Sequence, residues 1–154
     1  MHLEDQYLIF TLDKKRYAMG LICIQKVIRA VALHPLPEGQ DILLGLLNMQ
    51  GTIIPVIDIR RHFSLPSREL DLNDRIVISH VSDLTIAFVA DTVEGVVEIP
   101  EDHVDRAQTI FPHLDHVIDG VGKLKDNTVL IYSLDNLLSN GDIDTLKTAI
   151  ETYH

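Results

Sequence analysis

Histidine and acidic side chains are the groups in this sequence that could hold a metal ion. The densest group is His113-Leu114-Asp115-His116, with His103 nearby in the sequence. Zinc or iron requires three or four converging ligands, themselves held in place by hydrogen-bonding partners. This group instead lies in an acidic, proline-containing stretch that is typical of a surface loop. We interpret His113 and His116 as solvated loop residues and expect no metal site. A small metal-dependent hydrolase or a ligand-binding β-barrel that uses them is the alternative function.

A nucleophile for covalent catalysis is equally hard to find. Cys23 is the only cysteine and lies within an apolar run, which favours a buried and unreactive thiol. The sequence has no Gly-x-Ser-x-Gly elbow, no phosphate-binding loop and no His-Glu-x-x-His motif. Asp58, Asp91 and Asp135 each follow or interrupt an apolar strand, where a carboxylate usually serves as a cap or turn residue. We therefore expect a binding protein with no catalytic residues and no cofactor, not an enzyme.

Composition excludes several classes of partner. The 154 residues carry 13 Lys+Arg and 23 Asp+Glu, a formal net charge of -10. A nucleic-acid-binding protein needs a cationic face, and an anionic membrane surface repels a protein of this charge, so we expect neither partner. No apolar stretch approaches the ~18 residues of a membrane span, which predicts no membrane insertion. The acidic start and the single cysteine favour a cytoplasmic protein.

The elements that must position these side chains are mostly strands. Valine, isoleucine and leucine occur in short runs that are separated by turn residues. The runs predict strands at 7–12, 16–22, 27–33, 45–49, 52–57, 75–80, 84–91, 95–99, 117–124 and 128–132. Gln50-Gly51 is predicted to be a hairpin turn in which glycine supplies a positive φ. About ten short strands without strand–helix alternation predict a mainly β protein, either a barrel or a sandwich.

Helices are expected to be short and few. Asp58 is placed to cap a short helix at 59–63, and another turn of helix is expected within 134–139. The clearest helix is predicted at 142–152, with Asp142 as its N-cap. Its apolar residues have helical spacing, so one face should pack against the body of the protein.

A weak internal repeat divides the chain into two halves. Four segments match in the same order: Ile24–Val27 with Val93–Val96, Gly45 with Gly120, Thr52–Ile54 with Thr128–Leu130, and Asp58 with Asp135. This predicts two copies of one small β unit, joined by the polar segment 68–74. Gly45, Gly51 and Gly120 are predicted to be structural turn positions, where a side chain would crowd the backbone or φ would be positive.

The segment 44–63, LGLLNMQGTIIPVIDIRRHF, resembles the CheW family of bacterial chemotaxis proteins, whose signature is roughly G-x-x-N-L-R-G-x-x-x-P-V-[IV]-D-L-R-x-x-F. Further matches follow in order at 7–10, 17–18, 24–29, 88–93 and 130–138. The resemblance covers residues 6–140. It implies a mainly β fold of two packed SH3-like five-stranded β-barrels with short helices. We place one barrel at about 16–80 and the other at about 84–138, completed by the N-terminal strand 6–12.

The resemblance also implies a function. CheW-like proteins are non-catalytic adaptors that couple the cytoplasmic tips of methyl-accepting chemoreceptors to the regulatory domain of a CheA-type histidine kinase. We therefore expect an adaptor of chemotaxis or of a related motility pathway, associated with receptor arrays at the membrane.

Carried over by residue, the receptor-binding groove of the family corresponds here to six positions: Ile24, Lys26, Val27, Gln50, Val89 and Val93. Two of them depart from the family pattern, since Lys26 stands where the family carries glutamate and Gln50 where it carries arginine. Glutamine lacks the charged, bidentate fork of arginine, and a lysine in place of glutamate reverses a charge. The two departures predict an altered choice of receptor.

Overall fold

Strands and their turns make up most of the part of the chain that this computed structural model describes, residues 3–36, 42–106 and 118–153. The chain forms two compact units. Unit 1 contains residues 1–23 and 91–137, and unit 2 contains residues 24–90 and 138–154. Each unit is built on a single β-sheet, so the mainly β class predicted from the short apolar runs is confirmed.

The sheet of unit 2 has five strands in the order β3-β6-β7-β5-β4. They are β3 (Ile24–Arg29), β4 (Leu43–Met49), β5 (Thr52–Ile57), β6 (Arg75–Val81) and β7 (Leu84–Ala90). Neighbouring strands are antiparallel except β5 and β7, which are parallel. Aliphatic side chains from the four strands β4 to β7 form its core: Leu47, Ile54, Val56, Ile76, Ile78 and Ala87.

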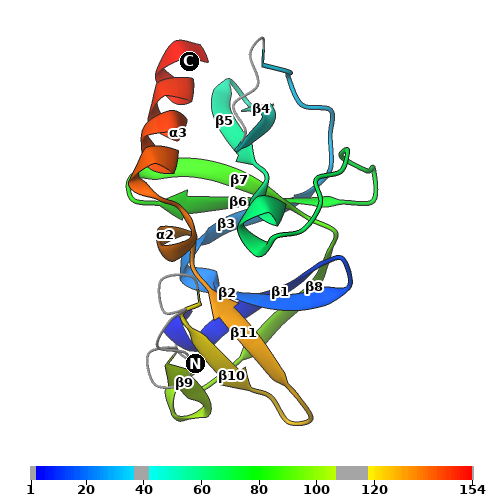
Figure 1. Ribbon diagram of the computed structural model, residues 1–154, viewed down its shortest axis with the longest axis vertical. Coiled ribbons are helices and arrows are strands. Elements are labelled where there is room, and N and C mark those ends of the chain that lie inside the picture. The colour runs from blue at the N-terminus through cyan, green and yellow to red at the C-terminus, as the bar shows by residue number, and fades with distance from the viewer. Residues whose placement is uncertain (1–2, 37–41, 107–117, 154) are drawn as a thin grey trace. The chain divides into compact units, whose positions relative to one another are not determined.

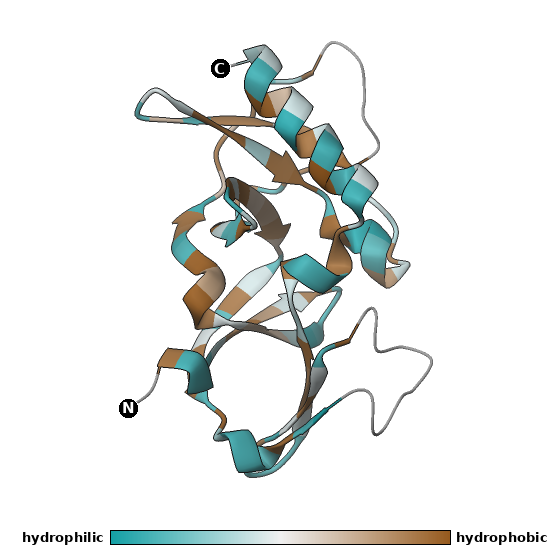
Figure 2. Cartoon of the chain, turned by 90° about the vertical axis from the view of Figure 1, so that its left-hand side faces the viewer, coloured by the Kyte–Doolittle hydropathy of each residue, from teal (hydrophilic) through white to brown (hydrophobic). Residues whose placement is uncertain are grey.

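Two helical elements complete unit 2. A 3-10 helix, η3 (Ile59–Phe63), begins at Asp58, whose carboxylate accepts a hydrogen bond from the backbone N–H of Arg60 at 3.1 Å, so the predicted cap is confirmed. The C-terminal helix α3 (Asn140–Tyr153) contacts β5. Figure 2 shows apolar and polar residues alternating along α3, and Leu146 and Ala149 are its buried residues.

The predicted start of the C-terminal helix is corrected by the structure. The helix begins at Asn140 and not at 142, and its cap is Ser139. The Ser139 hydroxyl accepts a hydrogen bond from the N–H of Asp142 at 3.0 Å, and the Asp142 carboxylate accepts one from the N–H of Ser139 at 3.0 Å. This reciprocal pair is a capping box, in which the serine is the cap and the acidic residue lies one turn inside the helix.

The sheet of unit 1 has six strands in the order β8-β1-β2-β11-β10-β9. They are β1 (Gln6–Leu12), β2 (Lys15–Gly20), β8 (Thr92–Glu98), β9 (Val104–Arg106), β10 (Gly120–Lys123) and β11 (Thr128–Tyr132). Short helices are η1 (Leu3–Asp5), η2 (Leu21–Cys23), η4 (Glu101–His103) and α2 (Leu134–Leu137). Figure 1 shows the blue hairpin β1–β2 lying between β8 and β11, so the first strands of the chain pair with the last.

The two sheets share one topology, which supports the internal repeat. In that correspondence β3, β6, β7, β5 and β4 of unit 2 match β8, β1, β2, β11 and β10 of unit 1, and each sheet has its parallel pair at the same place. The additional strand β9 also has a counterpart, a single bridge between His34 and Leu46 in unit 2. Pro35 next to that bridge has no backbone N–H, so the pairing cannot extend into a full strand there.

The boundary between the units differs from the one drawn on the sequence. The strand at 15–20 pairs with β1 and β11, and so lies in unit 1 and not in a barrel at 16–80. The strand at 84–90 pairs with β6 and β5, and so lies in unit 2 and not in a barrel at 84–138. The segment 68–74 does not join the units but connects η3 to β6 inside unit 2. Periodicity locates strands along the chain but carries no information on which strands pair.

The three predicted glycine positions fall into two kinds. Gly51 lies in a turn with φ of 89°, as expected. Gly45 and Gly120 lie inside strands and not in turns, where a neighbouring chain crosses closely. A Cβ added at Gly45 would lie 2.9 Å from the carbonyl oxygen of His34, and one at Gly120 would lie 2.7 Å from that of Asp105. Both glycines therefore leave space for the backbone of a neighbouring segment of the same unit. The two positions are equivalent in the internal repeat.

Candidate protein-binding surfaces

Three of the predicted groove residues lie on β3, an edge strand that pairs only with β6 in its sheet. Ile24 and Val27 are half-buried and Lys26 is exposed. The register slips between Ile24 and Lys26, so Gln25 is the extra residue of a β-bulge. A bulge changes the direction of the side chains on an edge strand and interrupts its hydrogen bonding to another strand. Bulges are frequent at sheet edges and next to functional sites.

Gln50, the fourth groove residue, occupies the first position of the two-residue turn between β4 and β5. Its φ is 54° and that of Gly51 is 89°, the signature of a tight hairpin turn. The turn is fixed by the side-chain oxygen of Asn48, which accepts a hydrogen bond from the N–H of Gly51 at 2.9 Å. The exposed Gln50 side chain therefore projects from a turn that is held by a hydrogen bond.

Val89 and Val93 lie in different units and on different kinds of strand. Val89 lies on β7, in the interior of the sheet of unit 2, and packs against the core of that unit. Val93 lies in unit 1 on β8, which is the edge strand of the six-stranded sheet. Five of the six groove positions thus belong to unit 2, and the assignment of all six to one receptor-binding groove stays a prediction.

The edge strand β8 of unit 1 has a β-bulge at the position equivalent to the bulge of β3. Its register slips so that Glu94 is unpaired between Val93 and Gly95, and Gly95 has a φ of 132° that other residues rarely adopt. Glu94 and Gln25 are matched positions of the internal repeat. The guanidinium of Arg16 donates a hydrogen bond to the Glu94 carboxylate at 3.1 Å.

Sequence reasoning did not identify an apolar groove in unit 2. This groove has a volume of about 710 Å³ and is walled by two segments, one after β3 and one before β6. Its apolar residues are Val31, Ala32, Leu33, Leu44, Leu70 and Leu72. Leu72 is 85% exposed, Val31 44% and Leu44 37%, so the groove gathers side chains that a monomer would ordinarily bury. The two leucines of Leu70-Asp71-Leu72 were the only sign of this groove in the sequence. The acidic residues around them led us to interpret the segment as a polar connection.

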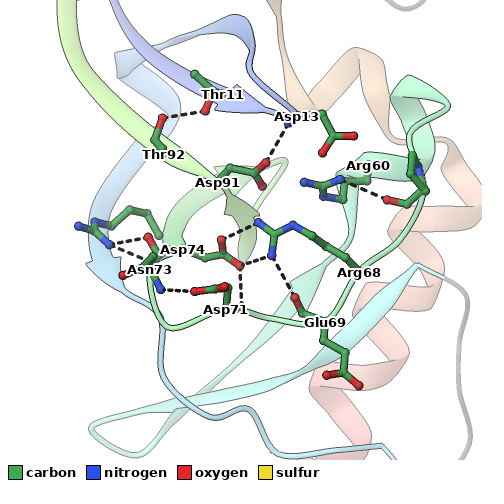
Figure 3. Close-up of polar contacts among 12 residues, drawn as sticks. Thr11, Asp13, Arg60, Arg68, Glu69, Asp71, Asn73, Asp74, Asp91 and Thr92 are labelled. Carbon is green, nitrogen blue, oxygen red and sulfur yellow. Dashed lines mark hydrogen bonds and ion pairs between the residues drawn. The ribbon is translucent and has the colours of Figure 1, made fainter.

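A polar network holds the wall of this groove in place. Asp74 is 2% exposed, and its carboxylate accepts hydrogen bonds from both terminal nitrogens of Arg68, at 2.6 and 3.0 Å. The same carboxylate accepts one from the backbone N–H of Asp71 at 2.8 Å, as Figure 3 shows. The segment 68–74, expected to be a polar connection between the two halves, is therefore a wall of this groove that its own hydrogen bonds hold in place.

The residues considered for catalysis form no site within the part of the chain that the structure describes. His113 and His116 lie outside the described residues, and within these no three His, Cys, Asp or Glu side chains gather in a way that could hold a metal ion. Cys23 is half-buried in η2, less enclosed than its apolar neighbours suggested. Burial, with smaller contributions from Asp135 and Asp119, raises the pKa of the Cys23 thiol, which reduces its nucleophilic thiolate form.

Two of the three aspartates have structural roles. Asp58 caps η3, and the Asp91 carboxylate accepts a hydrogen bond from the N–H of Asp13 at 2.8 Å. Asp135 lies inside α2 and does not precede it; the hydroxyl of Ser133 accepts the hydrogen bond at that helix start, from the N–H of Asn136 at 3.2 Å. Across residues 3–36, 42–106 and 118–153, no helix is long and apolar enough to span a membrane.

Comparison with known proteins agrees with this architecture. The family model for the CheW-like domain matches residues 6–142. The chemotaxis protein CheW of Thermotoga maritima is 28% identical over 135 residues, covering 84% of this chain and 83% of that protein. CheW of Klebsiella aerogenes is 22% identical over 150 residues, covering 97% and 90%. The crystal structure of the scaffolding protein TtCheW from Thermoanaerobacter tengcongensis matches with a TM-score of 0.78 at 23% identity, over 90% of this chain and 95% of that one.

Proposed function

This chain belongs to the CheW-like domain family, and we propose that it is a non-catalytic cytoplasmic adaptor that couples chemoreceptors to a CheA-type histidine kinase. The family places it among the scaffold proteins of chemotaxis. The receptor and kinase partners, and the pathway, are part of the proposal. The observation that carries it is that unit 2 has an edge strand and an apolar groove, each suited to a protein partner.

The first surface is the outer edge of β3 with the Gln50 turn. It offers half-buried aliphatic side chains, Ile24 and Val27, beside the exposed Lys26. A few well-packed residues near the centre of an interface supply most of the binding energy, and charged residues at the rim set the choice of partner. We assign the tip of the receptor to this edge, with Val89 of the same unit as a further contact.

The second surface is the apolar groove lined by Val31, Leu44 and Leu72. A patch of exposed aliphatic residues on an otherwise acidic protein indicates a partner that covers it. We assign the regulatory domain of the kinase to this groove. An adaptor must hold both partners at once, and two surfaces on different segments of unit 2 permit that.

The test is to titrate the purified chain with two proteins from its own organism, a soluble receptor-tip fragment and the kinase regulatory domain. Both should bind, separately and together. Leu72→Glu should remove kinase binding and retain receptor binding, because Leu72 is 85% exposed and its replacement does not disturb the core. Val27→Asp should do the reverse. Leu3→Glu, at a 49% exposed leucine in unit 1, is the matched control.

The outcomes separate the parts of the proposal. If neither protein binds the wild-type chain, the adaptor function is wrong. If both bind but Leu72→Glu and Val27→Asp bind as the wild type does, the function stands and the assigned surfaces are wrong. Circular dichroism of each variant shows whether a loss of binding reflects unfolding.

A further inference from the structure

The edge strand β3 and the adjoining first residue of β6, here called the β3–β6 edge, carry a concentration of positive charge on an acidic protein. Lys26 and Arg29 are both exposed on β3. Arg29 lies directly opposite Arg75 of β6 in the register of the sheet. The side chains of directly opposed residues stand within about 5 Å of one another at Cβ, so two like charges face each other here. The chain as a whole has a net charge of -10, which makes this local excess unusual.

Neighbouring groups of unit 2 do not neutralise this charge. The Nη1 atom of Arg75 donates hydrogen bonds to the backbone oxygens of Asn73 and Asp74, at 2.9 and 3.1 Å, and not to a carboxylate. The nearby Asp74 carboxylate is already engaged by Arg68. Within the described residues, no ion pair joins Lys26, Arg29 or Arg75 to an acidic group.

Two opposed arginines without a counter-ion cost stability, since like charges directly across a ladder repel. A guanidinium group is also well suited to receive a carboxylate in a bidentate geometry. The arrangement is therefore unfavourable in the isolated chain and favourable when an anion is supplied from outside. A partner protein that lies along the β3 edge can supply it with an acidic side chain.

We infer that the β3–β6 edge selects acidic segments of its partner, with Arg29 and Arg75 receiving a carboxylate and Lys26, on the opposite face of β3, adding a second cationic contact. This inference rests on the proposed receptor-binding role of the same edge. It specifies the partner further: the receptor segment that docks here carries Asp or Glu residues beside its apolar contacts.

The experiment measures binding of the soluble receptor-tip fragment from the same organism to the wild type and to Arg29→Gln, Lys26→Gln and the double variant. Lys147→Gln removes the same charge from an exposed position on α3 and is the matched control. Each substitution at the edge should raise the Kd about threefold, mainly by slowing association, and should weaken its dependence on salt. The control should change neither quantity.

Thermal unfolding provides a second readout, because Arg29→Gln removes a like-charge contact. Its unfolding midpoint should stay the same or rise, which shows that weaker binding does not come from a damaged fold.

Each outcome decides one question. A wild type that does not bind the receptor fragment contradicts the proposed function itself. A wild type that binds, with edge variants that keep its Kd and its salt dependence, overturns the inference and leaves the function standing. If inorganic phosphate stabilises the wild type but not Arg29→Gln, while receptor binding is equal for both, the edge is a phosphate site and the inference is also wrong.

Discussion

Asp74 and Arg68 form a two-pronged ion pair in which one partner is almost completely buried and the other is partly open to solvent. The Asp74 side chain is 3% exposed and the Arg68 side chain 36%. The carboxylate also accepts the backbone N–H of Asp71, and the backbone oxygen of Asp74 accepts a hydrogen bond from the N–H of Ala30 at 3.1 Å. Asp74 thus joins the start of β6 to the segments on both sides of the apolar groove.

Asp74→Asn should destabilise the protein by about 2 kcal/mol, because it leaves the Arg68 guanidinium without its charge partner and replaces a strong acceptor by a weaker one. Urea unfolding of the variant measures this loss. Asp83→Asn, at an exposed position in the turn between β6 and β7, is the control and should change stability by less than about 0.5 kcal/mol. A variant as stable as the wild type would show that the ion pair does not hold the wall of the groove.

Gly45→Val and Gly120→Val should each cost more than about 1 kcal/mol, because the added side chain meets a backbone oxygen that cannot move without breaking the sheet. Gly141→Ala is the opposite case. Its Cβ would have only the Ser139 hydroxyl within reach, at 3.7 Å, and alanine favours the helix, so we expect a gain of up to about 1 kcal/mol. Denaturant midpoints of the three variants give the comparison, and equal midpoints would mean that the two crossings tolerate a side chain.

Stability should fall as the pH rises from about 10 to about 12. Burial, with the nearby Tyr17 as a smaller cause, raises the pKa of Tyr132 to about 12 from its ordinary value of 10.0. Between these values the unfolded chain releases the phenol proton and the folded chain retains it, so ionisation favours unfolding. The loss should reach up to about 2 kcal/mol. Tyr132→Phe should reduce this alkaline loss, as followed by urea unfolding across the pH range; the same slope in both proteins would contradict the prediction.

The pair Lys26→Glu and Gln50→Arg should shift the chain's preference toward receptors of ordinary CheW proteins. The double exchange restores the acid and the arginine that the family pattern carries at these positions, and rim charges set the choice of partner more than the overall affinity. The measurement compares the Kd values for the chain's own receptor-tip fragment and for a standard one. An unchanged ratio of the two values would show that these positions do not read the partner.

The elements that could be predicted from sequence are those whose signal is local. The hairpin turn at Gln50-Gly51 and the cap at Asp58 follow from the preferences of single residues, and both are present. The boundary between the units could not be predicted, because it depends on which strands pair across more than half of the chain. The cap of α3 was misplaced by three residues since Ser139 and Asp142 both suit a helix start, and only the reciprocal hydrogen bonds distinguish them.

The candidate surfaces also differ in whether the sequence alone could predict them. Family resemblance proposed the β3 edge, whereas the apolar groove depends on Leu44 and Leu72, which the fold gathers from different segments. The opposition of Arg29 and Arg75 depends on the register of β3 against β6, which no local pattern fixes.

The pairing of β2 with β11 has a consequence for biosynthesis. Unit 2 has its five strands in one unbroken segment, so this sheet can form as soon as Ala90 has left the ribosome. The hairpin β1–β2 emerges first, yet it stays without β11 until Tyr132 has been made. Contacts between distant segments form slowly, and unpaired strand edges promote aggregation. The earliest part of the chain to be synthesised is therefore the one that a nascent-chain chaperone has to protect for longest.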